Sequence, residues 1–390
     1  MRVMHVITRM IIGGAQENTL YNCLDLRQLH GDEVLLVTGP AEGPEGDLLQ
    51  QGRAGDLPVE LLPELRRAIH PPRDVRALRS LRHLINRFQP DVVHTHSAKG
   101  GFLGRRAAWV ERVPAIVHTV HGAPFHPYQS AAARRLFQTC ERLAAGWCHQ
   151  LISVADAMTD LMADAGVAPR ERFITVYSGM DVEPFLAADS HRAAVRERLG
   201  FEDQHIVFGK IARLFHLKGH DDLITAAAQA VQRNPQVRFL LVGDGILRPA
   251  LQRRIDELGL NGHFVFTGLV PPSEIPGLIG AMDALVHTSF REGLARALPQ
   301  ALIAGRPVIS YDVDGAREVA INDQTGYLVA PGDTTTLAQR VAELAADSAA
   351  RVRMGRAGQQ RFADQFRHQQ MTAQLREIYL RVLNERNRRR

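Results

Sequence analysis

Cysteine, lysine and long apolar runs are scarce in this chain of 390 residues, and their scarcity excludes several classes of protein. The three cysteines, an odd number without the spacing of a zinc site, predict buried thiols in a reducing compartment rather than a disulfide framework. No apolar run approaches the roughly 18–20 residues of a membrane span, and the first residues form a strand pattern rather than a signal peptide. The sequence therefore predicts a cytoplasmic protein.

Basic charge is carried almost entirely by arginine, since Lys99, Lys210 and Lys218 are the three lysines and the net charge is +5. A positive balance favours acidic partners such as phosphates or an anionic membrane face. A lysine in so arginine-rich a chain either serves a site that needs a compact ammonium or is there by chance. For Lys210 both alternatives stay open.

The densest basic segment has arginines at positions 66, 67, 73, 76, 79 and 82, on and before an amphipathic helix predicted over 74–88. It is either a solvated outer face or a peripheral contact with anionic lipid headgroups at the inner face of the cell membrane. Because no aromatic residues are interleaved with these arginines, we expect no nucleic-acid partner.

Short apolar strands alternate with longer amphipathic segments along the chain, which predicts parallel α/β sheets with right-handed crossovers. A length of 390 residues exceeds one ordinary core, so two domains are expected. After a first strand over 3–7, Gly13 and Gly14 precede a helix predicted over 15–29. A glycine pair is either a plain turn or a place where the backbone can approach a phosphate without a Cβ in the way.

Four histidines follow two neighbouring strand patterns, with His94 and His96 in the first and His118 and His121 in the second. They do not favour a metal site, because His118 and His121 do not share a strand face and no carboxylate completes the set. His118 fits a structural role. His121 ends its strand before a glycine, where its imidazole can hydrogen-bond a sugar hydroxyl.

The stretch 286–318 reads as strand, loop, helix, strand and loop, with Glu292 in the first loop. The backbone N–H groups of Gly293, Leu294 and Ala295 are predicted at the start of the helix, which ends near Gly305. In a parallel sheet, Glu292 and these N–H groups lie at the carboxyl edge of the strands. Small anions bind at such helix N-termini.

This stretch resembles the signature of the retaining glycosyltransferases of family four, which have the two-domain GT-B fold. The residues that match are Glu292, Gly293, Leu294, Ala301, Gly305, Pro307 and Val308. The chain departs from the signature where Gln300 stands in place of the family's second glutamate.

The resemblance implies an α/β GT-B fold, with two Rossmann-like, doubly wound domains facing each other across a cleft. A second likeness, YSGMDVEPF at 177–185, implies a boundary between an acceptor-side domain, 1–180, and a nucleotide-sugar-binding domain, 181–366. The last helix, 367–390, is expected to cross back to the first domain.

The resemblance also implies a role for each residue of the predicted site. Arg213 and Lys218 neutralise the leaving nucleoside diphosphate, and His121 and Glu292 contact the transferred sugar, so these four are the predicted catalytic residues. Gln300 meets the ribose. The further donor-binding residues are Gly13, Gly14, Gly243, Leu269, Val270, Gly293, Leu294 and Ala295, and the acceptor-side residues are His96 and Lys99.

The implied function is the retaining transfer of a hexose from a nucleotide-diphosphate sugar, expected to be UDP-linked, to a glycan or polyprenyl-diphosphate-linked acceptor. We find no Asp-x-Asp motif of the sort that holds Mg²⁺ or Mn²⁺ in other sugar transferases, and neither metal nor cofactor is expected, because fixed cations and N–H groups can stabilise the departing charge. The segments 8–20 and 94–108 look most like members that assemble surface polysaccharides or lipid-linked glycans. The alternatives are a nucleotide-sugar 2-epimerase of the same architecture, a nucleotide-sugar-binding protein with weakened catalysis, and a basic nucleic-acid-binding protein.

Overall fold

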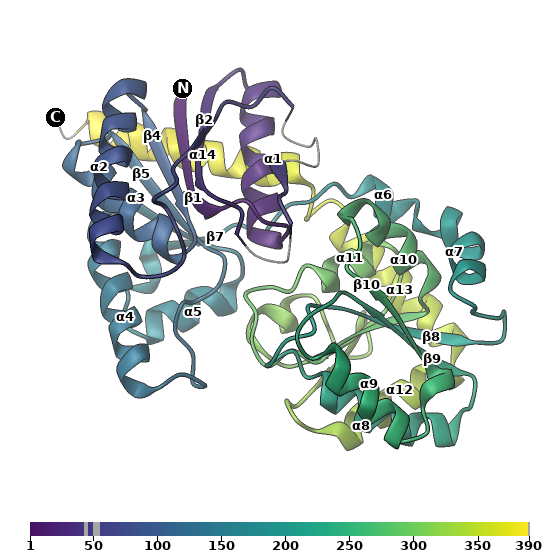
Figure 1. The fold of residues 1–390 in the computed structure, drawn as a ribbon. Helices are drawn as coiled ribbons and strands as arrows, with labels where there is room; N and C mark the ends of the chain where they lie inside the picture. The colour runs from purple at the N-terminus through teal and green to yellow at the C-terminus, as the bar shows by residue number, and fades with distance from the viewer. Residues whose placement is uncertain (43–45, 50–54, 389–390) are drawn as a thin grey trace. The chain divides into compact units, whose positions relative to one another are not determined.

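The computed structural model describes residues 1–42, 46–49 and 55–388, so the last two residues of the predicted C-terminal helix lie outside the described part of the chain. The chain divides into two compact units. The first contains Met1–Met180 together with Phe366–Arg390, and the second contains Asp181–Gln365. Figure 1 follows the chain through both units, with the C-terminal helix α14 beside the elements of the N-terminal part.

The first unit is built on a seven-stranded sheet in the order β3-β2-β1-β4-β5-β6-β7, in which every strand pair is parallel. The strands are β1 Arg2–Arg9, β2 Glu33–Gly39, β3 Val59–Leu61, β4 Val92–His96, β5 Ala115–Val120, β6 Gln150–Ser153 and β7 Phe173–Thr175. The helices are α1 Gly14–Gln28, α2 Pro71–Phe88, α3 Ala98–Val110, α4 Ala131–Ala145, α5 Asp156–Asp164 and α14 His368–Asn387.

Side chains of β1 alternate between two separate cores, one on each face of this sheet. Val3 and Ile7 pack in a cluster with α1 and α14, whereas Met4 and Val6 pack with α2 and α3. Successive residues of a strand point to opposite faces, so a strand buried on both sides reads as a continuous apolar run. The apolar start of the sequence therefore becomes a central strand.

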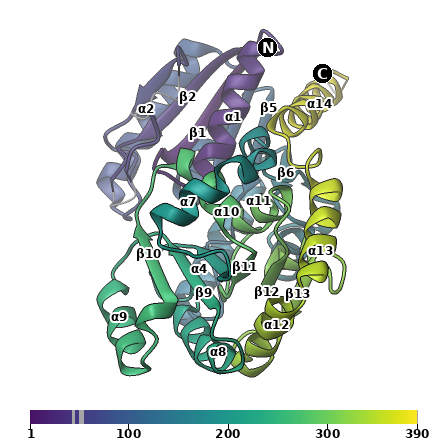
Figure 2. The same cartoon turned by 90° about the vertical axis from the view of Figure 1, so that its right-hand side faces the viewer.

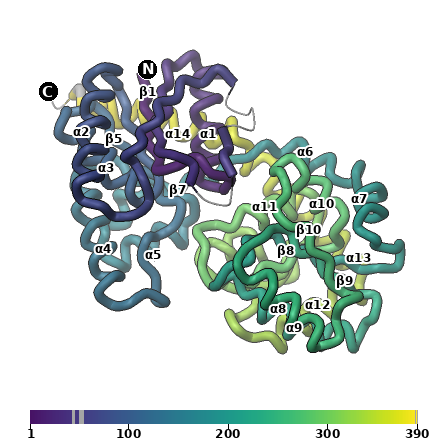
Figure 3. The backbone as a smooth tube through the Cα atoms, viewed as in Figure 1, coloured from purple at the N-terminus to yellow at the C-terminus, as the bar shows by residue number. Residues whose placement is uncertain are grey.

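Helix α14 is held in the first unit by polar contacts as well as by its apolar face. Its first residue, His368, hydrogen-bonds Asp25 of α1 at 2.7 Å, and Arg376 pairs with Asp32 at 2.8 Å. Farther along, the Tyr379 hydroxyl lies 2.5 Å from Nδ1 of His94. The tube in Figure 3 shows α14 in yellow beside α1 in purple, as predicted for a returning C-terminal helix.

The second unit is built on a six-stranded parallel sheet in the order β10-β9-β8-β11-β12-β13. Figure 2 labels β9, β10, β11, β12 and β13 of this sheet. The strands are β8 Ile206–Ile211, β9 Val237–Val242, β10 Phe264–Gly268, β11 Ala284–His287, β12 Val308–Tyr311 and β13 Gly326–Val329. The helices are α6 Glu183–Leu186, α7 Arg192–Arg198, α8 His220–Arg233, α9 Arg248–Glu257, α10 Ile275–Ala281, α11 Ala297–Ile303, α12 Thr334–Ala346 and α13 Ser348–Phe362.

One face of the second sheet carries a core built from α8, α9 and α12. Apolar side chains from these helices meet strand residues such as Phe208, Phe239 and Val286, all of which are fully or almost fully buried. No helix in the described part of the chain combines the length and hydropathy needed to cross a membrane.

Helix α11 begins later than the sequence predicted. It starts at Ala297, so Gly293, Leu294 and Ala295 lie in the loop before it rather than in its first turn. The predicted helix N-terminus at these three residues was therefore wrong. The local reason is visible in the chain, because the Gly293 carbonyl accepts a hydrogen bond from the Gly315 N–H and is used outside the helix.

Candidate functional site

The strand order of the second sheet reverses direction between β8 and β11. From β8 the chain builds outward to β9 and β10, and it then returns to the other side of β8 with β11, β12 and β13. Loops that leave the carboxyl ends of two such strands diverge and leave room for a ligand. Arg213 and Lys218 lie in the loop after β8, and Glu292 lies in the loop after β11, so all three belong to the switch point.

The Lys218 ammonium forms an ion pair with Oε1 of Glu292 at this switch point. His287, the last residue of β11, places Nε2 3.5 Å from the same oxygen. Burial alone would raise the pKa of Glu292, but the His287 imidazole and the Lys218 charge outweigh burial and hold that pKa well below its usual range. Glu292 is therefore ionised at neutral pH and can only accept hydrogen bonds.

A second carboxylate fixes the backbone of the Glu292 loop. Oδ2 of Asp314 accepts the Glu292 N–H at 2.6 Å, and Asp314 has a φ of +45°, which is unusual for a residue with a side chain. Asp314 also forms an Asp-x-Asp sequence with Asp312, although no metal-holding motif of this kind was expected. Asp312 pairs with Arg317 at 2.9 Å, so both carboxylates are already engaged within the chain.

Arg213 stands in the exposed part of the loop after β8. Its guanidinium carbon lies 5.1 Å from the ring centre of Phe215, and its carbonyl oxygen lies 3.0 Å from Nε2 of His220 at the start of α8. The same loop passes through Gly219, whose φ is +62° and where a Cβ would stand 2.0 Å from the Thr288 carbonyl. Glycine is therefore required where the loops after β8 and β11 touch.

Further predicted donor-binding residues lie at the neighbouring strand ends. Gly243 follows β9 and donates its N–H to the Gly268 carbonyl at 3.0 Å, which joins the ends of β9 and β10. Leu269 comes next and is 56% exposed, and Val270 is half-buried. Gln300 is half-buried on α11. The structure thus brings Gly243, Leu269 and Val270 to the carboxyl edge that also carries Lys218.

In the first unit, the strand order reverses between β1 and β4. Gly13 and Gly14 follow β1, and Gly14 opens α1. The ends of β1 and β4 are joined through Thr8, whose N–H donates to the Ser97 hydroxyl at 3.1 Å and whose Oγ1 accepts the Gly100 N–H at 2.9 Å. The glycine pair and the His96–Lys99 segment therefore lie at the two strand ends of one switch point.

His96 does not lie on a surface that an acceptor could reach, because it is completely buried. Its Nδ1 lies 3.0 Å from Nε2 of His121, and its Nε2 lies 3.0 Å from Nδ1 of His5. Burial lowers the pKa of His96 well below its ordinary value and that of His5 to about 3, so both rings are neutral. A predicted direct contact of His96 with the acceptor does not fit this burial.

These three imidazoles form a row in which the proton positions are coupled. A neutral imidazole donates from one nitrogen and accepts at the other, so His96 donates to His121 only when it accepts from His5. The row therefore holds the His121 ring and couples its tautomer to those of His96 and His5. The fully buried His5 carries an Nε2 atom without a hydrogen-bond partner in the described residues, at the far end of the row.

His5, His94 and His96 are the three described residues whose ligand atoms come within 4.8 Å of one another. His5 and His94 are register partners across β1 and β4, which explains why they meet. Both nitrogens of His94 are engaged, Nδ1 with Tyr379 and Nε2 with Thr119 at 2.7 Å. No carboxylate belongs to the cluster to balance a buried dication, so we assign it no metal.

Lys99, the other predicted acceptor-side residue, pairs with Asp74 of α2 at 2.7 Å and donates to the Ala68 carbonyl at 2.5 Å. Its side chain is 13% exposed. The ammonium thus ties the start of α3 to the start of α2. His118 has the structural role predicted for it, because its Nδ1 lies 2.9 Å from the Thr95 hydroxyl.

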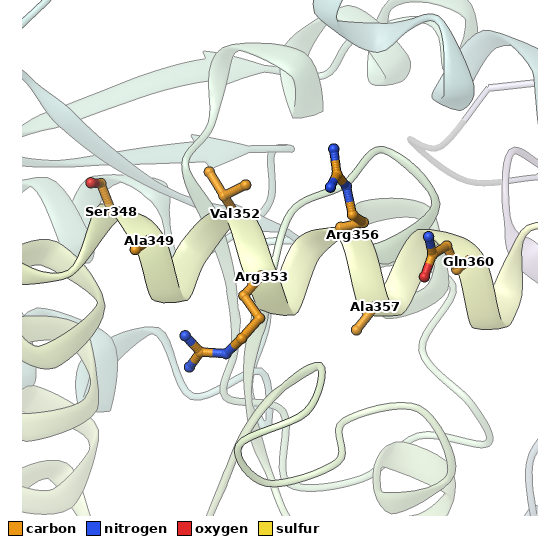
Figure 4. Close-up of a pocket in the computed structure, with 7 residues that line it drawn as sticks. All are labelled: Ser348, Ala349, Val352, Arg353, Arg356, Ala357 and Gln360. Carbon is orange, nitrogen blue, oxygen red and sulfur yellow. The ribbon is translucent and has the colours of Figure 1, made fainter.

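A shallow hollow on the second unit lies apart from these loops, along α13. Figure 4 shows its lining on one helix, including Val352, Arg353 and Arg356. None of the predicted donor-binding residues is part of this lining. It is an exposed helix face, and we assign it no role in the site.

Sequence reasoning did not assign four residues that the structure places in or under the two sites: His5, Lys210, His287 and Asp314. His287 and His5 could have been found, because each is a polar residue in or at the end of an otherwise apolar strand. No local pattern indicated the contact of Asp314 with the Glu292 backbone, because the two residues lie 22 positions apart.

Comparisons with known proteins identify both halves of the chain. Residues 13–179 match the family model "Glycosyl transferase 4-like domain", and residues 191–361 match "Glycosyl transferases group 1". A relative from Escherichia coli, UDP-Gal:alpha-D-GlcNAc-diphosphoundecaprenol alpha-1,3-galactosyltransferase, is 27% identical over 335 residues, which cover 85% of this chain and 84% of that protein. The capsular polysaccharide biosynthesis glycosyltransferase CapM of Staphylococcus aureus is 24% identical over 80% of this chain and 82% of its own.

Solved structures show the same architecture. Anabaena HepE in complex with UDP superposes with a TM-score of 0.80 at 24% identity, over 97% of this chain and 99% of that chain. Sucrose-phosphate synthase from Thermosynechococcus elongatus gives a TM-score of 0.80 at 18% identity, over 98% of this chain and 99% of that chain. Together with the two family models and the two doubly wound sheets, these likenesses show that the chain belongs to the family-four glycosyltransferases and has the GT-B fold.

Proposed function

We propose that this glycosyltransferase moves a hexose from a UDP-sugar to a glycan or polyprenyl-diphosphate-linked acceptor, with retention of the anomeric configuration and without a metal ion. The observation that carries the proposal is the Lys218–Glu292 pair at the switch point of the second sheet. It puts a fixed cation and an ionised hydrogen-bond acceptor side by side, at an edge where nucleotides bind in open α/β sheets.

Lys218 and Arg213 act on the leaving group. As the bond between the sugar and the diphosphate breaks, negative charge gathers on the phosphate oxygens. Cations already in position stabilise that charge without reorganisation, and an arginine adds bidentate contacts to the point charge of a lysine. We therefore propose that these two side chains serve in place of a metal ion, with the Gly13–Gly14 backbone as a further donor.

Glu292 and His121 act on the sugar. The ionised Glu292 accepts hydrogen bonds from sugar hydroxyls, and the Lys218 and His287 contacts hold it in one orientation. His121 hydrogen-bonds the transferred sugar. His96 has a positioning role, because its Nδ1 contacts Nε2 of His121 and so holds the His121 ring. Retention follows the resemblance to the family, with attack from the face that the phosphate leaves.

Gln300 contacts the ribose in this proposal. A glutamine keeps one acceptor but loses the charge-assisted hydrogen bonds that a glutamate forms, a difference of roughly 1–3 kcal/mol. Donor binding is weakened but not abolished. The base is held by the backbone near Leu269 and Val270, at the joined ends of β9 and β10.

The comparisons support UDP and a lipid-linked acceptor. HepE was solved with UDP and with UDP-glucose, and the Escherichia coli relative is named for UDP-Gal and a diphosphoundecaprenol acceptor. The first unit also exposes arginines beside apolar side chains at the start of α2, where Ile69 is 68% and Val75 is 48% exposed next to Arg67 and Arg76. Such a surface supports peripheral contact with an anionic membrane.

The test is a panel of UDP- and GDP-sugars, screened in EDTA for protection against thermal unfolding. The sugar that protects is then incubated with a short-chain polyprenyl diphosphate that carries one sugar, and the product linkage is read by NMR. We expect protection by a UDP-sugar and an α-linked product from an α-linked donor. An inverted product, or activity only after a divalent metal is added, would overturn the mechanism. Interconversion of the donor without transfer would instead identify an epimerase, and protection without turnover would identify a binding protein.

A further inference from the structure

Lys210 is a buried lysine that the mechanism above does not use. It is the fifth residue of β8 and is 1% exposed, although lysine is among the residues least often fully buried. Its Nζ donates to the Lys218 carbonyl at 2.7 Å and to the Thr288 hydroxyl at 2.5 Å. The side chain thus runs beneath the loop that carries Lys218.

The Thr288 hydroxyl extends this contact to both loops of the switch point. It accepts from Lys210 and donates to the Gly219 carbonyl at 2.6 Å. One buried amine therefore links β8, the loop after β8 and the end of β11. Lys210 is 1% exposed and belongs to no ion pair of the described residues, and a charged ammonium in such a place is costly unless a negative charge lies near.

Besides its burial, charges of both signs act on Lys210. No carboxylate of the described residues forms an ion pair with Lys210, and the charge of Lys218, in the loop after β8, disfavours a second positive charge there. Burial and Lys218 lower the pKa of Lys210 to about 7, while Glu292 across the switch point and Asp222 of α8 act in the opposite direction. The neutral imidazoles of His220 and His287 face it from α8 and β11. Within the described residues Nζ donates two hydrogen bonds, which is the number that a neutral amine can donate.

We propose, on the basis of the proposed donor site at Lys218, that Lys210 is a third cation of the diphosphate site, which takes up a proton from solvent when a nucleoside diphosphate binds. The amine accepts one proton and becomes an ammonium, and no other bond changes. A bound diphosphate adds negative charge above Lys218, which favours the ammonium over the amine. The site thus carries less uncompensated buried charge when it is empty and gains a cation when it is filled.

Isothermal titration of UDP in EDTA at pH 8.0, in two buffers with different ionisation enthalpies, measures the proton directly. We expect an uptake of about 0.5–0.9 proton per UDP, because a group that titrates near pH 7 is mostly neutral at pH 8. The affinity of the wild-type protein should fall by about tenfold between pH 7 and pH 9, as required when binding is linked to protonation. Lys210→Met should abolish both the uptake and this pH dependence.

Thr288→Val is the matched control, because it breaks the same link between the loops but keeps the amine. It should retain the proton uptake, whereas a purely structural role predicts that Thr288→Val and Lys210→Met behave alike. If Lys210→Met does not fold, Lys210→Gln replaces it. UDP binding without proton uptake by the wild-type protein would overturn the role of Lys210 and leave the proposed function standing. Failure to bind UDP, GDP or pyrophosphate would overturn both.

Discussion

The ion pair between Lys218 and Glu292 should contribute measurably to the stability of the second unit. Two unit charges about 4 Å apart attract by about 4 kcal/mol at an effective dielectric constant of about 20. Loss of hydration offsets part of this attraction, because the two side chains are only 20% and 23% exposed. We therefore expect a coupling energy of about 1–3 kcal/mol, above the roughly 0.2–1 kcal/mol of exposed pairs.

The assay is a double-mutant cycle of Lys218→Met and Glu292→Gln, measured by urea unfolding at pH 7.5, where the carboxylate is ionised. Both changes lie in the second unit, so the transition of that unit should move. The matched control is the exposed pair of Arg254 and Asp221, whose side chains are 40% and 59% exposed. A coupling energy for Lys218 and Glu292 no larger than that of the control would refute the pair as a fixed element of the site.

Three further predictions concern the donor, the histidine row and pH. Gln300→Glu should lower KM for the donor several-fold with little change in kcat, and an unchanged donor affinity would show that Gln300 does not contact the ribose. His96→Leu should lower kcat more than it raises KM, while His96→Asn, which keeps a polar group near Nδ1, should recover part of the loss; equal loss in both variants would contradict a positioning role. The unfolding free energy should fall as the pH drops below about 6.5, because His5, His94 and His96 stay neutral when folded but bind protons when unfolded. The slope should reach about 1.4 kcal/mol per pH unit for each histidine, down to about pH 3 for His5, and a flat profile between pH 7.5 and 5.5 would show that these rings are not buried.

The strand and helix pattern of the sequence was enough to predict parallel α/β sheets, because parallel strands buried on both faces leave uninterrupted apolar runs. The family signature around Glu292 supplied the rest, and the solved structures confirm the GT-B fold. The prediction failed at the start of α11, where the Gly293 carbonyl bonds to Gly315 instead of entering the helix. That contact joins two loops, and periodicity within one segment carries no information about it.

The site shows the same limit. Arg213, Lys218 and Glu292 each stand in a recognisable loop motif, and the structure has these loops at one switch point, where Lys218 pairs with Glu292. Lys210 could be noticed as a rare lysine, but its burial beneath the loop that carries Lys218 could not, because it depends on contacts such as that with Thr288, which is distant in sequence. The resemblance placed His96 on the acceptor side, whereas the structure buries it completely, with its Nε2 3.0 Å from Nδ1 of His5.

The most direct test of the donor site is the affinity of UDP in EDTA for the wild-type protein, for Lys218→Met and for Arg353→Met. Arg353 is an exposed cation on α13 of the same unit, and its loss matches the change in net charge. We expect the wild-type protein and Arg353→Met to bind UDP alike and Lys218→Met to bind at least about tenfold more weakly, as for loss of one charge-assisted contact. Equal affinity for all three proteins, or no binding of UDP by the wild-type protein, would contradict a diphosphate site at the switch point of the second sheet.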